Sequence, residues 1–486
     1  MPGLQFTKSP STLLRGAESL LILAPESRLQ DGEFLQALPE ELMRLALELV
    51  SDAPGGGSGA TLTTLTGDRR PRRLTVGILP DRVSRHNSPS RAHAVRGMSA
   101  ELGLSGEGRK AVLLALDDPE HYLPVANALG AAMPLFDARS GAGRRPTVQV
   151  LALGPEDEPI APSKRLKATV AAAQEAARLV DSPPSEMNPK GFQSAAWKLV
   201  SGLDGVTKKS IAGDALARAG LGGLHAVGRC ATESPRLLVL SAKGKGRSPK
   251  HVALVGKGIT YDTGGLSLKV GGSMQGMKAD MGGAAAVLGA FRALVEAGCQ
   301  HRLTALLCMA ENAIGPEAYK LDDVLTFHSG KTVEINNTDA EGRLALGDGV
   351  SYAARVLKAD VILDAATLTG AQLIATGKKH AAVVTNDETL EELLVDAGRA
   401  SGDLTHPLPF APEFYKRELK STIADMRNSV ADRMNAQSSC AAQFIYWHVE
   451  DTDVRWGHID MAGPAFIDRR ATGYGVALLE EAVRRL

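Results

Sequence analysis

The chain has 486 residues, of which 44% are hydrophobic, so it can bury a large core and favours a division into two domains. Its 55 Lys and Arg residues balance 55 Asp and Glu residues, and this net charge of zero argues against nucleic acid or strongly acidic partners. The four cysteines have no Cys-x-x-Cys spacing, which argues against a zinc knuckle or a disulfide framework and indicates free thiols in a reducing compartment.

Targeting and membrane segments are not expected. The apolar run Leu20–Leu23 follows several polar residues and lacks the layout of a signal peptide. No stretch approaches the ~18 uninterrupted apolar residues of a membrane span. The sequence is therefore interpreted as that of a soluble, cytoplasmic protein.

Residues 1 to about 160 alternate short apolar runs with helical patterns, which predicts a small α/β domain with a largely parallel sheet. Between its elements, Ser51–Ala60 is interpreted as a glycine-rich surface loop and Arg69–Arg73 as a solvated basic edge, with an anion patch as the alternative. The expected strands are Leu20–Ala24, Thr75–Leu79, Ala111–Leu116 and Thr147–Leu153, and the expected helices are Phe34–Val50, Ser90–Leu102 and Pro119–Ala132.

An alanine-rich helix is expected from about Ser163 to Val180, and it marks the domain boundary. It ends at Ser182-Pro183-Pro184 because the residue before a proline is pushed out of helical space. This divides the chain into an N-terminal α/β domain, 1–162, and a larger C-terminal domain, 163–486, with a linker helix over about 163–181.

The C-terminal part returns to a β-α-β pattern, which predicts a second α/β domain around a mixed, largely parallel sheet. Its clearest helix is Gly282–Gly298, which follows Asp280 so closely that this carboxylate would lie beside a positive helix N-terminus. The expected strands are Arg236–Leu240, His251–Val255, Arg302–Met309, Ala359–Asp364 and Ala381–Thr385.

Two stretches in this part concentrate charged residues. After the strand His251–Val255, a glycine-rich segment is interpreted as a loop at the strand's carboxyl end, where open parallel sheets bind ligands. This first stretch carries Lys257, Asp262, Lys269 and Asp280.

The second stretch is Asn337–Leu344, in which Asp339, Glu341 and Arg343 occupy every second position. In an extended segment this spacing sends all three side chains to one side. Together the two stretches supply four carboxylates and three cations, and this many oxygen ligands suits two divalent ions about 3.5–4 Å apart that activate a water. The alternative is a set of structural acids paired with Lys257, Lys269 and Arg343.

Both stretches resemble signatures of the leucyl (cytosol) aminopeptidase family, whose hallmark Asn-Thr-Asp-Ala-Glu-Gly-Arg-Leu is present letter for letter at 337–344. The resemblance extends to Val180–Pro189, Ala365–Gly370 and His458–Gly463, and so covers most of the chain from about residue 165 onward. The segments Arg85–Ser90 and Ser429–Arg433 are similar to the branch of probable aminopeptidase-like proteins.

The resemblance implies a homohexameric exopeptidase with a catalytic C-terminal domain and two divalent ions per chain, Zn²⁺ or Mn²⁺, with Mg²⁺ or Co²⁺ as alternatives. It implies that Lys257, as a neutral amine, is a metal ligand together with Asp262, Asp280, Asp339 and Glu341. Lys269 would stabilise the oxyanion, and Arg343 would hold a bicarbonate ion that serves as general base. The implied substrate pocket is Met277, Thr367 and Gly370.

Two other functions are weighed against peptide hydrolysis. A two-metal phosphoesterase could use the same carboxylates, but Lys257 at a metal site fits a neutral amine better than a phosphate. A scaffold or nucleic-acid-binding role is argued against by the neutral charge. The sequence contains no H-E-x-x-H motif, and no G-x-S-x-G elbow lies near Ser267 or Ser329, which disfavours zincin and serine hydrolase mechanisms.

Overall fold

The computed structural model describes residues 3–51, 59–67, 70–98, 101, 103–104, 106–141 and 145–486. The expected loop Ser51–Ala60, the basic run Arg69–Arg73 and the end of the expected helix Ser90–Leu102 fall partly outside the described residues. Two compact units are present: the first extends through Gln174 and includes Gly398–Gly402, and the second comprises Glu175–Ala397 and Asp403–Leu486. None of the described helices combines the length and apolar character that crossing a bilayer requires.

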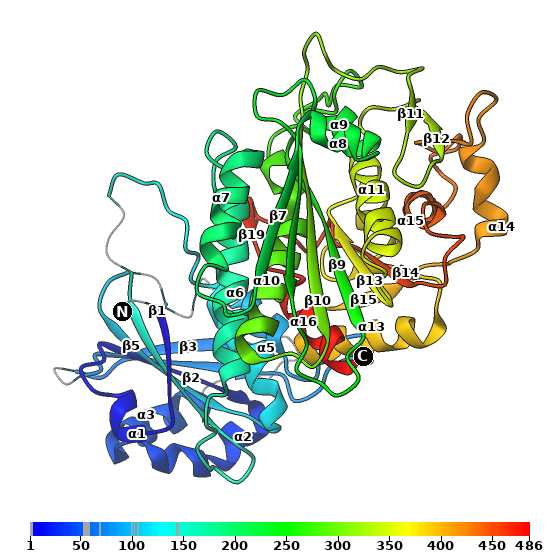
Figure 1. Ribbon diagram of the computed structural model, residues 1–486. Coiled ribbons are helices and arrows are strands. Elements are labelled where there is room, and N and C mark those ends of the chain that lie inside the picture. The colour runs from blue at the N-terminus through cyan, green and yellow to red at the C-terminus, as the bar shows by residue number, and fades with distance from the viewer. Residues whose placement is uncertain are drawn as a thin grey trace. The chain divides into compact units, whose positions relative to one another are not determined.

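The first unit is built on a six-stranded sheet in the order β1-β6-β5-β2-β4-β3. Figure 1 labels β1, β2, β3 and β5 of this sheet. All neighbours are parallel except β3 and β4, which confirms the expected largely parallel sheet. The edge strands β1 and β3 were not expected, since their half-buried, polar-containing sequences lack the continuous apolar run of a central strand. The strands are β1 Gly3–Thr7, β2 Ser19–Pro25, β3 Ala60–Leu65, β4 Arg73–Leu79, β5 Arg109–Ala115 and β6 Thr147–Leu153.

The expected single helix Phe34–Val50 is wrong. The chain forms a 3₁₀ turn, then breaks at Leu38, which is extended because Pro39 follows it. The expected helix Ser90–Leu102 is also shorter in the structure. The described helices of this unit are α1 Pro10–Leu13, α2 Glu26–Asp31, η1 Glu33–Ala37, α3 Glu40–Ser51, α4 Ala92–Gly97, η2 Pro119–His121 and α5 Tyr122–Ala131, and α6 Lys164–Asp181 leads into the second unit.

An eight-stranded sheet in the order β15-β14-β17-β13-β9-β10-β8-β7 forms the centre of the second unit. Its middle strands β17, β13, β9 and β10 are parallel, whereas β14, β8 and β7 add antiparallel pairs, so the expected mixed, largely parallel sheet is confirmed. The strands are β7 Thr207–Ala212, β8 Arg236–Ala242, β9 His251–Asp262, β10 Arg302–Asn312, β13 Val361–Ala366, β14 Ala381–Thr385, β15 Thr405–Pro407 and β17 Arg455–Asp460.

Helices cover both faces of this sheet. Successive residues of a strand point to opposite faces, and a Cβ at Gly256 of β9 would meet α10 (Gly282–Ala297), whereas Val255 lies against α11 (Glu341–Arg355). Figure 1 shows these two helices beside the strands. The remaining elements are α7 Pro189–Leu199, α8 Asp214–Arg218, α9 Gly222–Gly228, η3 Met277–Met281, β11 Val324–Thr326, β12 Thr332–Glu334, α12 Gly370–Ala375, α13 Glu388–Ser401, α14 Pro412–Tyr415, η4 Lys416–Leu419, β16 Met426–Arg427, α15 Gln437–Trp447, β18 Phe466–Ile467, β19 Arg470–Ala471 and α16 Val476–Arg485.

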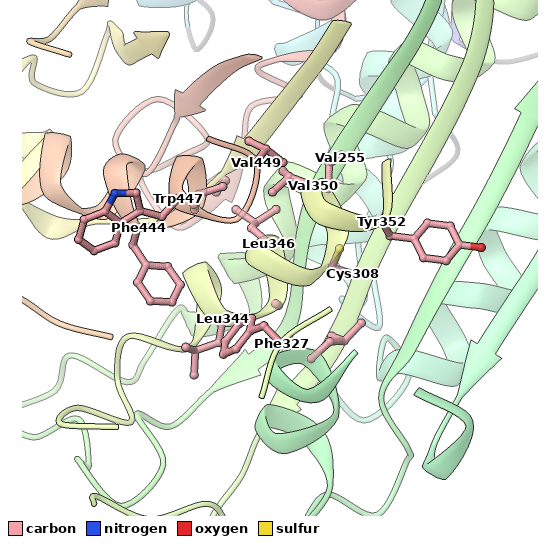
Figure 2. Close-up of a cluster of buried hydrophobic side chains, with 14 of the residues drawn as sticks. Val255, Cys308, Phe327, Leu344, Leu346, Val350, Tyr352, Phe444, Trp447 and Val449 are labelled. Carbon is pink, nitrogen blue, oxygen red and sulfur yellow. The ribbon is translucent and has the colours of Figure 1, made fainter. Parts of the chain in front are cut away.

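Helix α11 is almost completely enclosed, with every residue from Glu341 to Ala354 buried. Figure 2 shows its Leu346 and Val350 among side chains of the sheet and of α15. Phe327 contacts Phe444 of α15 edge to face, with ring centroids 6.0 Å apart. This packing fixes the helix whose first turn carries two of the predicted site residues.

Candidate active site

Strand β9 carries Lys257 and ends at Asp262, so the expectation that Gly256-Lys257-Gly258 forms a loop is wrong. The glycines of this strand allow neighbouring elements to pack closely against it. A Cβ at Gly256 would lie 2.4 Å from Ala284 Cα of α10. Helix and strand therefore approach closely only because residue 256 has no side chain, and both charged residues are held on a rigid central strand.

The expectation that Asp339, Glu341 and Arg343 alternate along an extended segment is also wrong. Helix α11 begins at Glu341, with Asp339 in the turn before it. Residues two apart on a helix are separated by about 200° around its axis, so strand alternation does not explain how these side chains meet. They nonetheless line the same cavity, because all three belong to the N-terminal end of α11 and the turn that enters it.

The Lys257 side chain is fully enclosed. Its Nζ lies 2.8 Å from Asp280 Oδ2 and 3.0 Å from Glu341 Oε1, and it donates a 2.9 Å hydrogen bond to the Thr367 carbonyl. Burial disfavours the ammonium, but Asp280 and Glu341 outweigh this effect and raise the pKa of Lys257. A Cβ at Gly342 would lie 2.5 Å from Lys257 Cε and 2.6 Å from Nζ, so residue 342 must lack a side chain.

Gly342→Ala is therefore expected to displace Lys257 and to weaken divalent-metal binding about 10- to 100-fold, as changes beside metal ligands commonly do. Calorimetric titration with Mn²⁺ measures this. Alanine is the better helix former, so the variant should remain folded. Gly97→Ala is the matched control, since a Cβ at this helical glycine meets nothing within 4 Å. Equal Mn²⁺ affinity in both variants would show that the enclosure of Lys257 is not required.

Lys269 bridges the second pair of carboxylates. Its Nζ lies 2.8 Å from Asp262 Oδ2 and 2.6 Å from Asp339 Oδ1. Burial would lower its pKa, but Asp262 and Asp339 outweigh burial and raise it, so the side chain is a cation at neutral pH. Each lysine thus spans two of the four carboxylates that the sequence singled out.

The acidic side chains are crowded. Asp262, Asp280 and Glu341 are buried and offer oxygens that all lie within 4.8 Å of one another. Burial and the neighbouring Glu341 raise the pKa of Asp262, and burial raises the pKa of Asp280 well above its usual value. Among the described residues, Glu341 Oε2 is buried without a hydrogen-bond partner. Four carboxylates against two lysines leave excess negative charge and unused oxygen ligands, which fits divalent cations.

Arg343 lies beside this cluster. Its Nη1 donates a 2.9 Å hydrogen bond to the Asn428 carbonyl, and its Nε has no partner among the described residues. Burial lowers the pKa of Arg343 to about 10, so the guanidinium remains charged at neutral pH. An unused, buried N–H of this kind is suited to an anion.

Two buried asparagines that the sequence did not reveal hold the acidic loop, residues 336–340, which leads into α11. Asn428 Oδ1 accepts from the Asn336 and Asn337 amides at 2.9 and 3.2 Å, and its Nδ2 donates to the Asn337 carbonyl at 2.6 Å. Asn312 Nδ2 donates to Asp262 Oδ1 at 2.8 Å and to the Thr338 carbonyl at 3.1 Å. Neither residue has a recognisable spacing from its partners, so no sequence pattern could have singled them out.

The charged cluster opens into a cavity of about 880 Å³ in the second unit. The three residues expected in a substrate pocket, Met277, Thr367 and Gly370, all line it. Thr367 Oγ1 also donates to Asp280 Oδ1 at 2.9 Å, which joins the pocket wall to the acidic cluster. The remaining wall is mainly apolar, a composition typical of small-molecule sites.

Comparisons with known proteins find relatives that span nearly the whole chain. The model for the cytosol aminopeptidase family, catalytic domain, matches residues 174–480, and that for M17 aminopeptidase N-terminal domain 2 matches residues 31–142. Probable aminopeptidase NPEPL1 of Homo sapiens is 44% identical over 493 residues, covering 98% of this chain and 92% of that protein. The structure of Caenorhabditis elegans leucine aminopeptidase has a TM-score of 0.90 and 34% identity, covering 99% of this chain and 98% of that one. Leucyl aminopeptidase from Trypanosoma brucei in complex with bestatin has a TM-score of 0.90 and 36% identity, covering 99% and 95%.

Proposed function

The chain belongs to the cytosol aminopeptidase family and is a metalloaminopeptidase, and we propose that it releases N-terminal residues from peptides with two divalent ions. The observation that supports this proposal is the convergence of Asp262, Asp280 and Glu341 within 4.8 Å at one end of a cavity large enough for a peptide. The neighbouring Lys269 and Arg343 supply the positive charges that acyl transfer to water requires.

The residues assigned to the ions are Lys257, Asp262, Asp280, Asp339 and Glu341. When bound, the ions, Zn²⁺ or Mn²⁺ by preference and Mg²⁺ or Co²⁺ as alternatives, would supply a water of lowered pKa and polarise the scissile carbonyl. Lys257 serves this role as a neutral amine, because an ammonium has no lone pair to donate. Asn312 holds the Asp262 carboxylate in place, and Asn428 holds the backbone of the acidic loop.

The remaining steps fall to two cations. Lys269, an ammonium at neutral pH, stabilises the negative charge that develops on the substrate carbonyl oxygen. Arg343 holds a bicarbonate ion through its unused N–H, and that ion would supply a base for the nucleophilic water. Met277, Thr367 and Gly370 receive the side chain of the first residue.

An aminopeptidase of this design should require a free α-amine. We expect Leu-Gly-Gly to be cleaved and its N-acetyl derivative to be cleaved at least about 10³-fold more slowly, since acetylation turns the amine into an amide whose nitrogen has no basic lone pair for a metal ion. Liquid chromatography of the released leucine measures both rates. Comparable rates for the two peptides would reject the exopeptidase assignment.

The assembly and location are further proposals, which rest on family membership. We place the protein in the cytoplasm, in keeping with relatives named cytosol aminopeptidase, and we propose a homohexamer.

A further inference from the structure

The mouth of the cavity differs in charge from its inner end. At the inner end, Lys257 and Lys269 are each paired with two carboxylates. Arg433 is another cation of the cavity wall, and no carboxylate of the described residues lies within 4.0 Å of it. Its neighbour Met434 is 91% exposed and Ile374, which also lines the cavity, is 90% exposed, so this part of the wall is the rim.

The turn that carries Arg433 is held in place by hydrogen bonds. Asp432 Oδ1 accepts from the Met434 amide at 2.8 Å, which closes the turn. Glu418 holds the turn from outside: its Oε2 accepts from the Asp432 amide at 3.2 Å, and its Oε1 accepts from Asn435 Nδ2 at 2.9 Å. The Ala431 amide donates to the Glu418 carbonyl at 3.0 Å. The guanidinium is therefore presented from a fixed backbone.

This distribution of charge along the cavity indicates which groups of a substrate would bind there. With its ions bound, the inner end would take the α-amine of a peptide, and a peptide that begins there extends toward the rim. A cation at the rim without a counter-ion is complementary to a carboxylate further along that peptide. Arg433 is well suited to this contact, because a guanidinium can bind both oxygens of a carboxylate.

We propose that Arg433 binds a carboxylate on the leaving-group side of the substrate, and that this carboxylate is the C-terminus of a short peptide. The enzyme would then prefer peptides of two to four residues with a free C-terminus. This inference rests on the proposed aminopeptidase function. An acidic side chain in a longer peptide offers the same chemistry, so the test must separate the two sources.

The test compares matched substrates. Leu-Gly, Leu-Gly-Gly and Leu-Gly-Gly-Gly are assayed as free acids and as C-terminal amides, and Leu-Gly-Asp-amide is compared with Leu-Gly-Asn-amide. One of these peptides should have the length at which its C-terminus reaches Arg433. For that peptide, we expect kcat/KM of the free acid to exceed that of the amide about threefold to tenfold. Because the contact is remote from the reacting bond, the difference should lie in KM, with kcat unchanged, and it should shrink as salt is raised.

Two variants of Arg433 and one control variant test whether Arg433 causes the preference for the free acid. Arg433→Gln should abolish the preference for the free acid, and Arg433→Lys should retain part of it. The control Arg417→Gln should leave the preference intact, since Arg417 is 79% exposed, does not line the cavity and lies on the Glu418 side of the turn. Leucine release measures all rates, as for the wild type.

Each outcome has a distinct meaning. If wild type cleaves none of the acids or amides, the proposed aminopeptidase function fails. If it cleaves them with an acid-to-amide ratio that Arg433→Gln does not change, the inference about Arg433 is wrong while the function stands. If Arg433→Gln changes only the ratio of the rates for Leu-Gly-Asp-amide and Leu-Gly-Asn-amide, Arg433 binds an acidic side chain and the assignment to the C-terminus is wrong.

Discussion

Lys269→Ala is expected to lower kcat about 10²–10³-fold while both metal ions stay bound, a loss typical of removing one group that stabilises an oxyanion. Lys269 is the cation that lies between Asp262 and Asp339, with Nζ within 2.8 Å of each. Its removal leaves these carboxylates with less positive charge nearby, which favours a divalent cation rather than expelling one. Steady-state kinetics with Leu-Gly-Gly and metal analysis by mass spectrometry measure the two quantities.

Lys269→Arg and Lys320→Ala complete the experiment. The arginine keeps the charge but changes the position of the donor, so we expect partial activity, whereas the exposed Lys320 should be dispensable. Loss of metal from Lys269→Ala would make Lys269 a residue that shapes the metal site. Full activity of the variant would make it a counter-ion only.

Lys257→Arg should reduce the metal content from close to two ions per chain to close to one. Arginine stays protonated in proteins and has no lone pair for a metal, so the ion that Lys257 and Asp280 hold should be lost. The other ion keeps Asp262, Asp339 and Glu341. Activity should fall to background, and mass spectrometry after dialysis measures the stoichiometry. Two ions retained in the variant would remove Lys257 from the ligand set.

The same lysine predicts how metal binding depends on pH. Asp280 and Glu341 raise the pKa of Lys257, so without metal its ammonium form dominates at neutral pH. A metal ion that binds this nitrogen must displace a proton, and protons compete more strongly as the pH falls. Occupancy of this site in the wild type should therefore decrease with decreasing pH.

The sequence predicted the sheets better than the helices beside them. Buried parallel strands are nearly continuous apolar runs, as in Val361–Ala366, and such runs are visible without a structure. Helix α11 was not expected, because its glycines are poor helix formers. A Cβ at Gly349 would lie 2.5 Å from Cys308 Sγ of β10, so tertiary packing demands a residue that local propensity disfavours.

For the site, the predicted residues converge, but the reason given for their convergence was wrong. The alternation of Asp339, Glu341 and Arg343 suggested a strand, whereas the chain turns into α11 at Glu341. The hydrogen bonds that support the site could not be predicted from the sequence, for a different reason. Asn428 meets Asn337 across 91 residues of chain, and a single asparagine gives no periodic signal that marks such a contact.

The burial of α11 from Glu341 to Ala354 also determines where this protein can move. A helix packed on all sides exchanges its amide hydrogens only when much of the unit opens, whereas exposed turns exchange through small local fluctuations. The turn around Arg433 and Met434 is of the second kind. We therefore expect the amide hydrogens of this turn to exchange before those of α11, whose first turn carries Glu341 and Arg343.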